Sequence, residues 1–362
     1  MSILDGLNPQ QAAAVAHREG PAVVIAGPGA GKTRVLTARA ASLLAEGVKP
    51  ERILLLTFTR AAANTMIGRA RAADERAEFL TAGTFHSWGI KILNANSHVF
   101  GLDKPFTMLD QGDTEDLVKR VMEPLKGEKN WPRASTIAKI ISYATNTQMS
   151  VVDALAKKAP DHIELAEEVE KVRDALVELK ISKGLIDYDD VLSYLSMLLE
   201  DEEIGQKIRE QYDYVMVDEY QDTNELQLGI VHGLVGNNGN VTIVGDPGQS
   251  IYAFRGGAPA TMARFRDAFP GTKVIPLETN YRSSPEIIEL VNAIDGRMDI
   301  GFERTLRAGR PSGPKPVIMD VSDNAAEAAA IADGKDQHRR TQRKRQVHTD
   351  KSPSWTRIRQ SS

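Results

Sequence analysis

The stretch PAVVIAGPGAGKT, residues 21–33, decides the fold of this chain. Its apolar first half predicts a buried strand, and its glycines predict a turn that leads into a helix. The N–H groups of such a turn face inward and cradle phosphate oxygens, and the helix N-terminus adds partial positive charge. Lys32 is placed to reach the β- and γ-phosphates and Thr33 to ligate Mg²⁺. The strand–turn–helix order favours a phosphate-binding loop over a glycine-rich turn in which GKT occurs by chance. The predicted cradle consists of Ala26, Gly27, Pro28, Gly29, Ala30, Gly31, Lys32 and Thr33.

A phosphate-binding loop of this kind needs acidic side chains on a neighbouring strand, and VMVDEYQDT (residues 215–223) provides them. Asp218 would hold Mg²⁺ through water, because magnesium gives up its water shell reluctantly. Glu219 is placed to orient and deprotonate an attacking water. Taken alone, these two residues would be read as solvated acids at a strand end. Together with the loop they indicate that the chain binds ATP with Mg²⁺.

The sequence around these two motifs predicts an α/β fold. Apolar runs that fit buried strands occur at residues 21–26, 52–58, 212–218, 240–246 and 272–278. Helical stretches lie between them at residues 33–46, 61–71 and 225–235. Continuously apolar strands that alternate with helices predict a parallel sheet covered on both faces.

The middle of the chain interrupts this alternation. Residues 91–184 are mostly charged helical segments, such as those at 114–122 and 163–182, and strand patterns nearly vanish there. We therefore expect a helical insertion into a first domain that is made of residues 1–90 and 185–282.

The alternation resumes after residue 282. A helix at 285–294, a strand at 316–321 (PVIMDV) and a helix at 325–332 predict the start of a second, incomplete domain at residues 283–333. Residues 334–362 then carry nine Lys and Arg against two Asp, without apolar periodicity. We interpret them as a disordered basic tail. It either contacts nucleic-acid phosphates or is the scar of a frameshift.

Composition narrows the class of protein. The chain has 362 residues, 45 Lys and Arg, 49 Asp and Glu, a net charge of −4 and 41% hydrophobic residues, which is typical of globular proteins. The absence of cysteine excludes disulfides, a thiolate zinc site and a cysteine nucleophile. The N-terminal sequence resembles no secretory signal, and no apolar run is long enough to span a membrane. We expect a soluble, cytoplasmic protein.

Six motifs together resemble the superfamily 1 DNA helicases of the UvrD, PcrA and Rep type. They are AGPGAGKT, LLTFTRAAANTM, AGTFHSWG, DEYQDTNELQ, VGDPGQSIYAFRGG and LETNYRSSPEII, and they occur in the family's order over about four-fifths of the chain. The resemblance implies two RecA-like P-loop NTPase domains with ATP between them, the first domain carrying the helical insertion. It also implies an ATP-dependent 3′–5′ helicase that binds single-stranded DNA and single-strand/double-strand junctions and serves repair or replication.

The resemblance assigns roles around ATP. It makes Gln11, in LNPQQ, the reader of adenine, whose edge suits a side chain that both donates and accepts. Gln249 would sense the γ-phosphate, Arg282 would pair with it through a planar donor fork, and Tyr281 would stack on adenine. Further contacts to the nucleotide or to the magnesium network are implied for Arg34, Asp222 and Asp246.

The same resemblance implies DNA contacts. Aromatic faces that would stack on bases are those of Phe58, Tyr252 and Phe254. Positions near the DNA backbone, or coupling DNA to ATP, are Thr59, Thr84, His86 and Arg255. Core packing is the alternative for Phe58 and His86, and it is the interpretation we favour for Phe85.

The sequence departs from the family in two ways. Arg60 and Ala61 replace the usual Asn-Lys, Phe254 replaces Trp, and RGG replaces RGA. The two last motifs of the second domain, a Lys-Gly segment that contacts DNA and a second arginine at ATP, are not found. The pattern resembles a truncated or frameshifted reading frame, or half of a split gene.

Four functions therefore stay open. The first is a helicase that is intact only with a separately encoded C-terminal half. The second is a non-motor fragment that binds ATP and single-stranded DNA. The third is the motor part of a helicase–nuclease whose nuclease lies elsewhere, because no nuclease-type carboxylate cluster is found. The fourth is a P-loop phosphotransferase unrelated to DNA.

Overall fold

The computed structural model describes residues 5–102, 106–127, 130–236, 239–250, 261–297, 302 and 304–332. The chain divides into two compact units, Met1–Gly313 and Pro314–Ser362. None of the helices among the described residues combines the length and the apolar character needed to cross a lipid bilayer.

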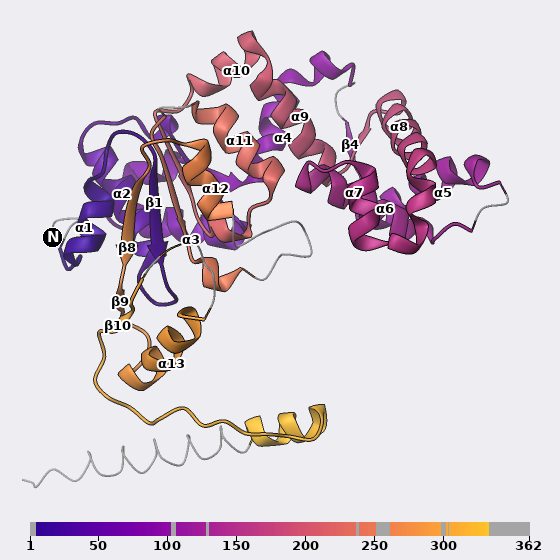
Figure 1. Ribbon diagram of the computed structural model, residues 1–362. Coiled ribbons are helices and arrows are strands. Elements are labelled where there is room, and N and C mark those ends of the chain that lie inside the picture. The colour runs from indigo at the N-terminus through magenta and orange to yellow at the C-terminus, as the bar shows by residue number, and fades with distance from the viewer. Residues whose placement is uncertain are drawn as a thin grey trace, which may run out of the picture. The chain divides into compact units, whose positions relative to one another are not determined.

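A six-stranded parallel sheet forms the centre of the first unit (Figure 1), in the order β3-β2-β6-β7-β1-β8. The strands are β1 (Ala22–Ala26), β2 (Ile53–Thr57), β3 (Thr81–Thr84), β6 (Tyr214–Val217), β7 (Val241–Gly245) and β8 (Lys273–Leu277). Strands β1, β2 and β7 are buried at every position, which is why they read as continuous apolar runs. The predicted α/β fold and five of its strands are confirmed, whereas β3 was not predicted.

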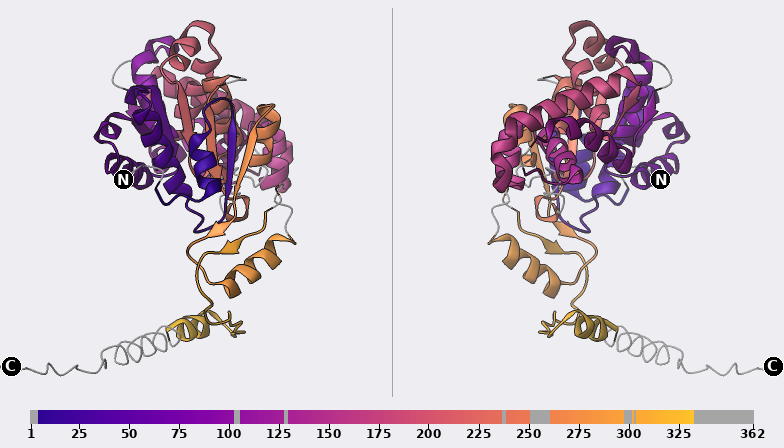
Figure 2. Two further views of the ribbon diagram at one scale, coloured as in Figure 1. Left: turned by 90° about the vertical axis from the view of Figure 1, so that its left-hand side faces the viewer. Right: turned by 90° about the vertical axis from the view of Figure 1, so that its right-hand side faces the viewer.

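Helices cover both faces of this sheet (Figure 2). One face packs on α1 (Pro9–Ala16), α2 (Lys32–Ala45) and α3 (Arg60–Arg71). The other face packs on α4 (Phe85–Asn96), α9 (Tyr188–Glu200), α10 (Glu202–Arg209), α11 (Glu225–Val235) and α12 (Thr261–Ala268). Neighbouring strand residues such as Val23 and Val24 belong to opposite cores, as the alternation of side chains along a strand requires.

The predicted helical insertion has a core of its own, which runs from Val118 to Leu176. Its helices are α5 (Gln111–Met122), α6 (Ala134–Thr147), α7 (Val151–Lys158) and α8 (Ala166–Ser182). The helix predicted at residues 163–182 starts later, because a 3₁₀ turn occupies Pro160–Leu165. The predicted boundary at residue 91 falls within α4, which packs against the sheet.

The chain enters and leaves the insertion at one place. There β4 (Thr107–Met108) and β5 (Leu185–Ile186) pair in parallel. The Thr107 N–H donates to the Gly184 carbonyl at 2.9 Å, and the Leu109 N–H donates to the Ile186 carbonyl at 2.8 Å. These bonds hold both ends of the insertion side by side.

Two asparagines join the insertion to the sheet domain. Asn224, the residue that caps α11, donates from Nδ2 to Oδ1 of Asn146 on α6 at 2.7 Å. Asn146 in turn donates from Nδ2 to Oδ1 of Asp189 on α9 at 2.8 Å. This bridge reaches the loop that follows β6, so α6 is tied to the segment that carries the predicted catalytic carboxylates.

The chain after β8 forms β9 (Thr279–Asn280), α13 (Pro285–Asp295) and β10 (Arg307–Ala308), and β9 pairs with β10. The predicted helix at 285–294 is confirmed. The predicted strand at 316–321 is wrong: these residues lie in no strand, and Ile318 is 93% exposed. Apolar residues form a stable strand only when a neighbouring strand bonds their backbone. Residues 324–332 are helical, as expected, and the basic tail at 334–362 lies outside the described residues.

Candidate nucleotide-binding site

The predicted site lies at the carboxyl edge of the sheet, where the loops after neighbouring strands meet. The phosphate-binding loop follows β1, Asp218 follows β6 and Asp246 follows β7. Strand β7 lies between β1 and β6, so Asp246 is placed between the loop and Asp218. Parallel strands thus bring together residues that are far apart in sequence.

The backbone of the loop is shaped to hold phosphate. Gly29 and Gly31 adopt left-handed conformations with φ of 77° and 92°. Between them, the Ala30 N–H donates to the Gly27 carbonyl at 3.2 Å. Gly31 also caps α2 without a side chain, so the first N–H groups of that helix are left for an anion.

Lys32 links three loops. Its Nζ lies 3.1 Å from Oε2 of Glu219 and donates to Oε1 of Gln249 at 3.4 Å. Its side chain is 11% exposed, whereas that of Glu219 is 36% exposed and reachable by water. The three residues come from β1–α2, from the loop after β6 and from the loop after β7, and meet where the resemblance implies a γ-phosphate.

Asp218 is a buried carboxylate with one oxygen that accepts no hydrogen bond in the described part of the chain. Burial, with a smaller contribution from the charge of Glu219, raises the pKa of Asp218 to about 7. Within the described part of the chain, its Oδ1 has no hydrogen-bond partner. A cation beside this oxygen would satisfy it, so Asp218 suits the predicted Mg²⁺, for which Thr33, the neighbour of Lys32 in the chain, is the other predicted ligand.

Glu219 itself sits in a strained backbone. Its φ of 49° and ψ of 45° are left-handed, which is uncommon for a residue other than glycine. Gln221, which is 1% exposed, braces this turn: its Nε2 donates to Oε2 of Glu219 at 3.0 Å and to Oδ2 of Asp222 at 3.3 Å. Its Oε1 accepts from the Asp246 N–H at 2.9 Å. Gln221 therefore fixes the loops after β6 and β7 to each other.

The NYRSS segment is attached directly to the phosphate-binding loop. The Tyr281 N–H donates to the Gly29 carbonyl at 3.0 Å, and the buried Asn280 donates from Nδ2 to the Pro28 carbonyl. A Cβ at Gly29 would lie 2.5 Å from Cβ of Arg282, so only glycine permits this approach. Tyr281 and Arg282 are both exposed, as a base-stacking and a phosphate-pairing side chain would need to be.

Gln11 supports the loop in this structure. Its Nε2 donates to the Ala30 carbonyl at 2.9 Å, and its Oε1 accepts from the Asn8 N–H at 3.2 Å. These bonds engage the amide atoms that would read adenine, so the predicted role stays a prediction. Tyr281 lies close by, since its hydroxyl accepts from Nδ2 of Asn8 at 2.9 Å. Arg34 is exposed and donates from Nη2 to the Asp5 carbonyl at 3.2 Å.

The predicted DNA residues divide into two groups. Tyr252, Phe254 and Arg255 lie outside the described residues. Of the others, Thr59 and Thr84 cap α3 and α4, so their hydroxyls already accept backbone N–H groups. Phe58 and His86 are half-buried. Phe85 is 3% exposed within the core, which confirms the packing role we favoured for it.

Three side chains that the sequence analysis did not assign lie beside the predicted site residues. Tyr188 is 54% exposed, and its ring meets that of His86 edge-on at 5.5 Å, which offers an aromatic face beside a predicted DNA residue. Gln221 joins the loops after β6 and β7, and Asn280 holds the predicted phosphate-binding loop, as described above. An exposed tyrosine at the first turn of an amphipathic helix was a usable signal for Tyr188. The two amides gave none, because their partners are distant in sequence.

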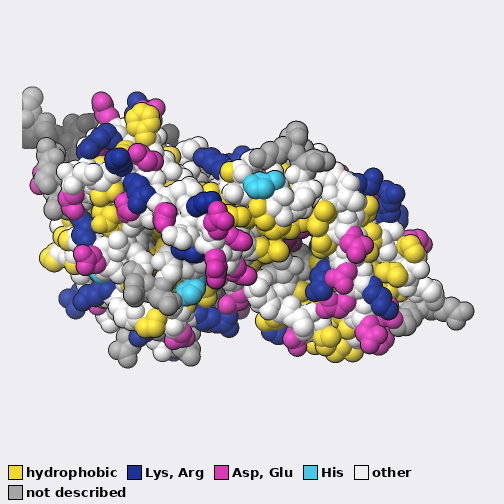
Figure 3. All heavy atoms as spheres, turned by 90° about the horizontal axis from the view of Figure 1, so that it is seen from above, with side chains coloured by type: hydrophobic (Ala, Val, Ile, Leu, Met, Phe, Trp, Pro, Cys, Tyr) yellow, Lys and Arg dark blue, Asp and Glu magenta, His cyan; other side chains and the backbone are white. Residues whose placement is uncertain are grey.

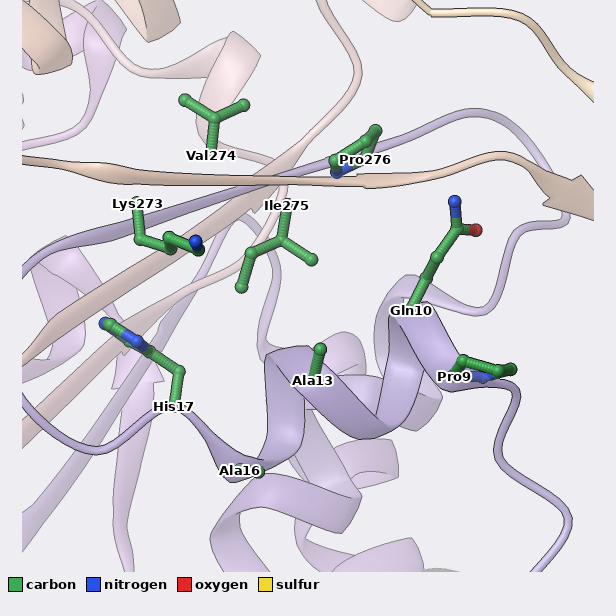
Figure 4. A pocket seen from close by; sticks show the side chains of 9 residues that line it. All are labelled: Pro9, Gln10, Ala13, Ala16, His17, Lys273, Val274, Ile275 and Pro276. Carbon is green, nitrogen blue, oxygen red and sulfur yellow. The ribbon is translucent and has the colours of Figure 1, made fainter.

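Two further surface features point to no particular ligand. An open surface groove of about 460 Å³ lies between α1 and the edge strand β8, where Ala13 and Ile275 line it (Figure 4). Its lining shares no residue with the predicted phosphate cradle. Acidic and basic side chains are interspersed over the face in Figure 3.

Comparison with known proteins shows which family the sequence matches. The family described as the UvrD/REP helicase N-terminal domain matches residues 7–270. The ATP-dependent DNA helicase UvrD1 of Mycobacterium tuberculosis is 35% identical over 351 residues, which cover 92% of this chain and 45% of that relative. The ATP-dependent DNA helicase PcrA of Leuconostoc citreum is 37% identical over 298 residues, which cover 81% of this chain and 39% of that relative. The chain spans about half the length of the curated relatives it matches. It belongs to the UvrD/REP helicase family.

Proposed function

We propose that this chain supplies the ATP-binding part of a helicase motor that moves 3′ to 5′ along single-stranded DNA. The observation that carries the proposal is the meeting of Lys32 with Glu219 and Gln249, because it joins a phosphate ligand, a general base and a phosphate sensor. Relatives named as ATP-dependent DNA helicases support DNA as the substrate. A DNA substrate also fits the cytoplasmic location expected from the sequence.

A small rearrangement of these side chains would prepare the site for ATP hydrolysis. In this structure Lys32 pairs with Glu219 at 3.1 Å. Phosphate oxygens in the loop would attract Lys32 and release the Glu219 carboxylate to accept a proton from water. Gln249 would then orient toward the terminal phosphate. Thr33 and Asp218 would hold Mg²⁺, which neutralises charge on the phosphate oxygens.

Arginines would complete the site. Arg282 lies beside the phosphate-binding loop and is exposed, so its planar fork is available to a phosphate. The family's second arginine belongs to a motif that this sequence lacks, and the loss of such an arginine costs about 10³–10⁵ in rate. We propose that a further polypeptide segment, such as a separately encoded C-terminal half, supplies it.

Single-stranded DNA would lie across the loops after β2 and β3. Phe58 follows β2, and His86 and Tyr188 form an aromatic pair beside β3. Each base stacked on an aromatic ring contributes about 1–3 kcal/mol, largely independent of sequence. Strand β2 is the neighbour of β6, which Asp218 and Glu219 follow, so DNA bound after β2 would lie next to the proposed catalytic carboxylates.

The test is ATP hydrolysis by the purified chain with Mg²⁺, with and without single-stranded oligonucleotides, and with Lys32→Ala as the control. We expect nucleotide binding that Lys32→Ala removes, and slow hydrolysis that DNA stimulates. Binding without stimulation by any oligonucleotide would contradict the DNA motor and favour a phosphotransferase. Absence of nucleotide binding in the wild-type chain would contradict the proposal altogether.

A further inference from the structure

Arg304 is a buried cation that joins two carboxylates from different parts of the first unit. Its side chain is 3% exposed. Nη1 lies 2.6 Å from Oδ1 of Asp246, and Nη2 lies 2.9 Å from Oδ2 of Asp295. Nε also donates to the same Asp295 oxygen at 3.0 Å. Asp246 follows β7 in the ATP site, whereas Asp295 is the last residue of α13.

Asp246 passes this contact on to the predicted phosphate sensor. Its Oδ2 accepts a hydrogen bond from Nε2 of Gln249, and its Oδ1 accepts from the Gly248 N–H at 3.0 Å. Gln249 in turn presents Oε1 to Nζ of Lys32. An unbroken series of polar contacts therefore runs from Asp295 through Arg304, Asp246 and Gln249 to the lysine of the phosphate-binding loop.

The arginine is needed because Asp246 is buried. Its side chain is 1% exposed, and its backbone N–H is held by Gln221. Burying a carboxylate is unfavourable unless a cation pairs with it. Without Arg304 the Asp246 carboxylate would shift toward water, and the Gln249 amide that donates to it would be free to rotate.

Packing leaves this cluster little freedom. A Cβ built at Gly248 would lie 3.2 Å from Nη2 of Arg304, 3.4 Å from Oδ1 of Asp246 and 3.5 Å from Oδ1 of Asp295. The backbone of the sensor loop thus lies directly against the ion pairs. A planar guanidinium can contact both carboxylates at once, which the single ammonium of lysine does less well.

We propose that Arg304 is a positioning residue of the ATP site: it fixes Asp246, and through it the Gln249 amide, in register with α13. The arginine touches no nucleotide itself. It makes recognition of the terminal phosphate depend on the position of α13, so a displacement of that helix changes the affinity for ATP more than the affinity for ADP. The inference rests on the proposed nucleotide function of this site.

The test compares the binding of fluorescent AMPPNP, a non-hydrolysable ATP analogue, and of fluorescent ADP, both with Mg²⁺, by the full chain. We expect the wild-type chain to bind AMPPNP more tightly than ADP. In Arg304→Met, AMPPNP binding should weaken by about tenfold, which is the contribution of one hydrogen bond from the Gln249 amide to the charged terminal phosphate. ADP binding should change by less than about twofold. Arg304→Lys, which keeps the charge, should restore part of the difference.

Lys180→Met is the matched control for a purely structural effect. Lys180 is 4% exposed and pairs with Asp187 at 2.8 Å and with Asp190 at 2.7 Å, so it too is a buried cation between two carboxylates. It lies in the segment from α8 to α9, away from the phosphate loop. Its replacement should lower the unfolding temperature and leave the AMPPNP-to-ADP affinity ratio unchanged.

Each result of these binding measurements either supports or overturns the inference. A folded Arg304→Met with the wild-type affinity ratio, or a wild-type chain that binds both nucleotides equally, overturns the inference and leaves nucleotide binding standing. A wild-type chain that binds neither nucleotide overturns the proposed function together with the inference. If Arg304→Met does not fold, Asp295→Asn decides, because it keeps the pair with Asp246. An unchanged affinity ratio in Asp295→Asn refutes the role of α13, and a reduced ratio supports it.

Discussion

Replacing Asp218 by asparagine should make the nucleotide-free protein more stable, and only at neutral and alkaline pH. The substitution keeps the shape of the side chain and removes its charge. Asp218 is 5% exposed and lies beside Glu219, so its ionised form is unfavourable in the folded chain. An active-site carboxylate that costs stability is expected where function needs a charge that folding does not.

The magnitude follows from the pKa. Burial raises the pKa of Asp218 from 3.8 to about 7, and each pKa unit corresponds to about 1.4 kcal/mol, so the ionised group costs up to about 4 kcal/mol. Because the folded pKa lies above the unfolded one, the folded state binds more protons between about pH 4 and 7. Wild-type stability therefore falls as the pH rises through that window. The amide of the Asp218→Asn variant does not titrate, so the advantage of the variant should grow from near zero at about pH 4 to its full value at about pH 8.

The assay is urea denaturation of both proteins at several pH values between about 4.5 and 8, with a chelator to remove Mg²⁺. Asp116→Asn, at an exposed position of α5, is the control, and should change the free energy of unfolding by less than about 0.5 kcal/mol at every pH. A difference between wild type and Asp218→Asn that does not vary with pH would refute the reasoning, since burial of a charge must show as a titration.

Three further predictions concern the neighbouring contacts. Gly29→Ala should abolish nucleotide binding and destabilise the protein by more than the roughly 1 kcal/mol of backbone strain. Its control is Gly20→Ala, which has a similar φ of 80° but nothing within 4 Å; equal effects of the two would contradict the predicted clash. Tyr188→Ala should weaken single-stranded DNA binding by about 1–3 kcal/mol in a fluorescence anisotropy titration, whereas Met197→Ala, an exposed residue of the same helix, should not. Asn146→Ala should cost about 1–3 kcal/mol of stability in thermal or urea unfolding, because it removes the bridge between the buried Asn224 and the half-buried Asp189, and an unchanged midpoint would show that water replaces it.

The sequence predicted the parallel sheet well because its strands are buried on both faces and therefore apolar throughout. Strand β3 escaped this criterion, since TAGT has small and polar side chains and is half-buried at three of its four positions. The opposite error occurred at residues 316–321, where an apolar run suggested a strand. Hydrophobicity predicts burial, but strand formation also depends on a bonding neighbour, which a local sequence does not reveal.

The site was predictable to the extent that its chemistry lies in short motifs. Lys32, Asp218 and Glu219 could be placed together because the carboxyl ends of parallel strands share one edge. Asn280 and Arg304 could not, because an asparagine and an arginine acquire their roles from partners that are distant in sequence. The contact of the buried Gln11 amide with the phosphate-binding loop was likewise not predictable, and its adenine role stays a prediction.

The pairing of β4 with β5 gives the helical insertion the character of a cassette. Both of its ends are fixed at one point by two backbone hydrogen bonds, so a change in the length of what lies between them need not move the strands of the main sheet. A lineage can therefore enlarge, shorten or exchange this segment while the ATP chemistry stays in place. An exchanged segment would, however, lose the hydrogen bond between Asn146 and Asn224, and with it the contact between the insertion and the loop that follows β6.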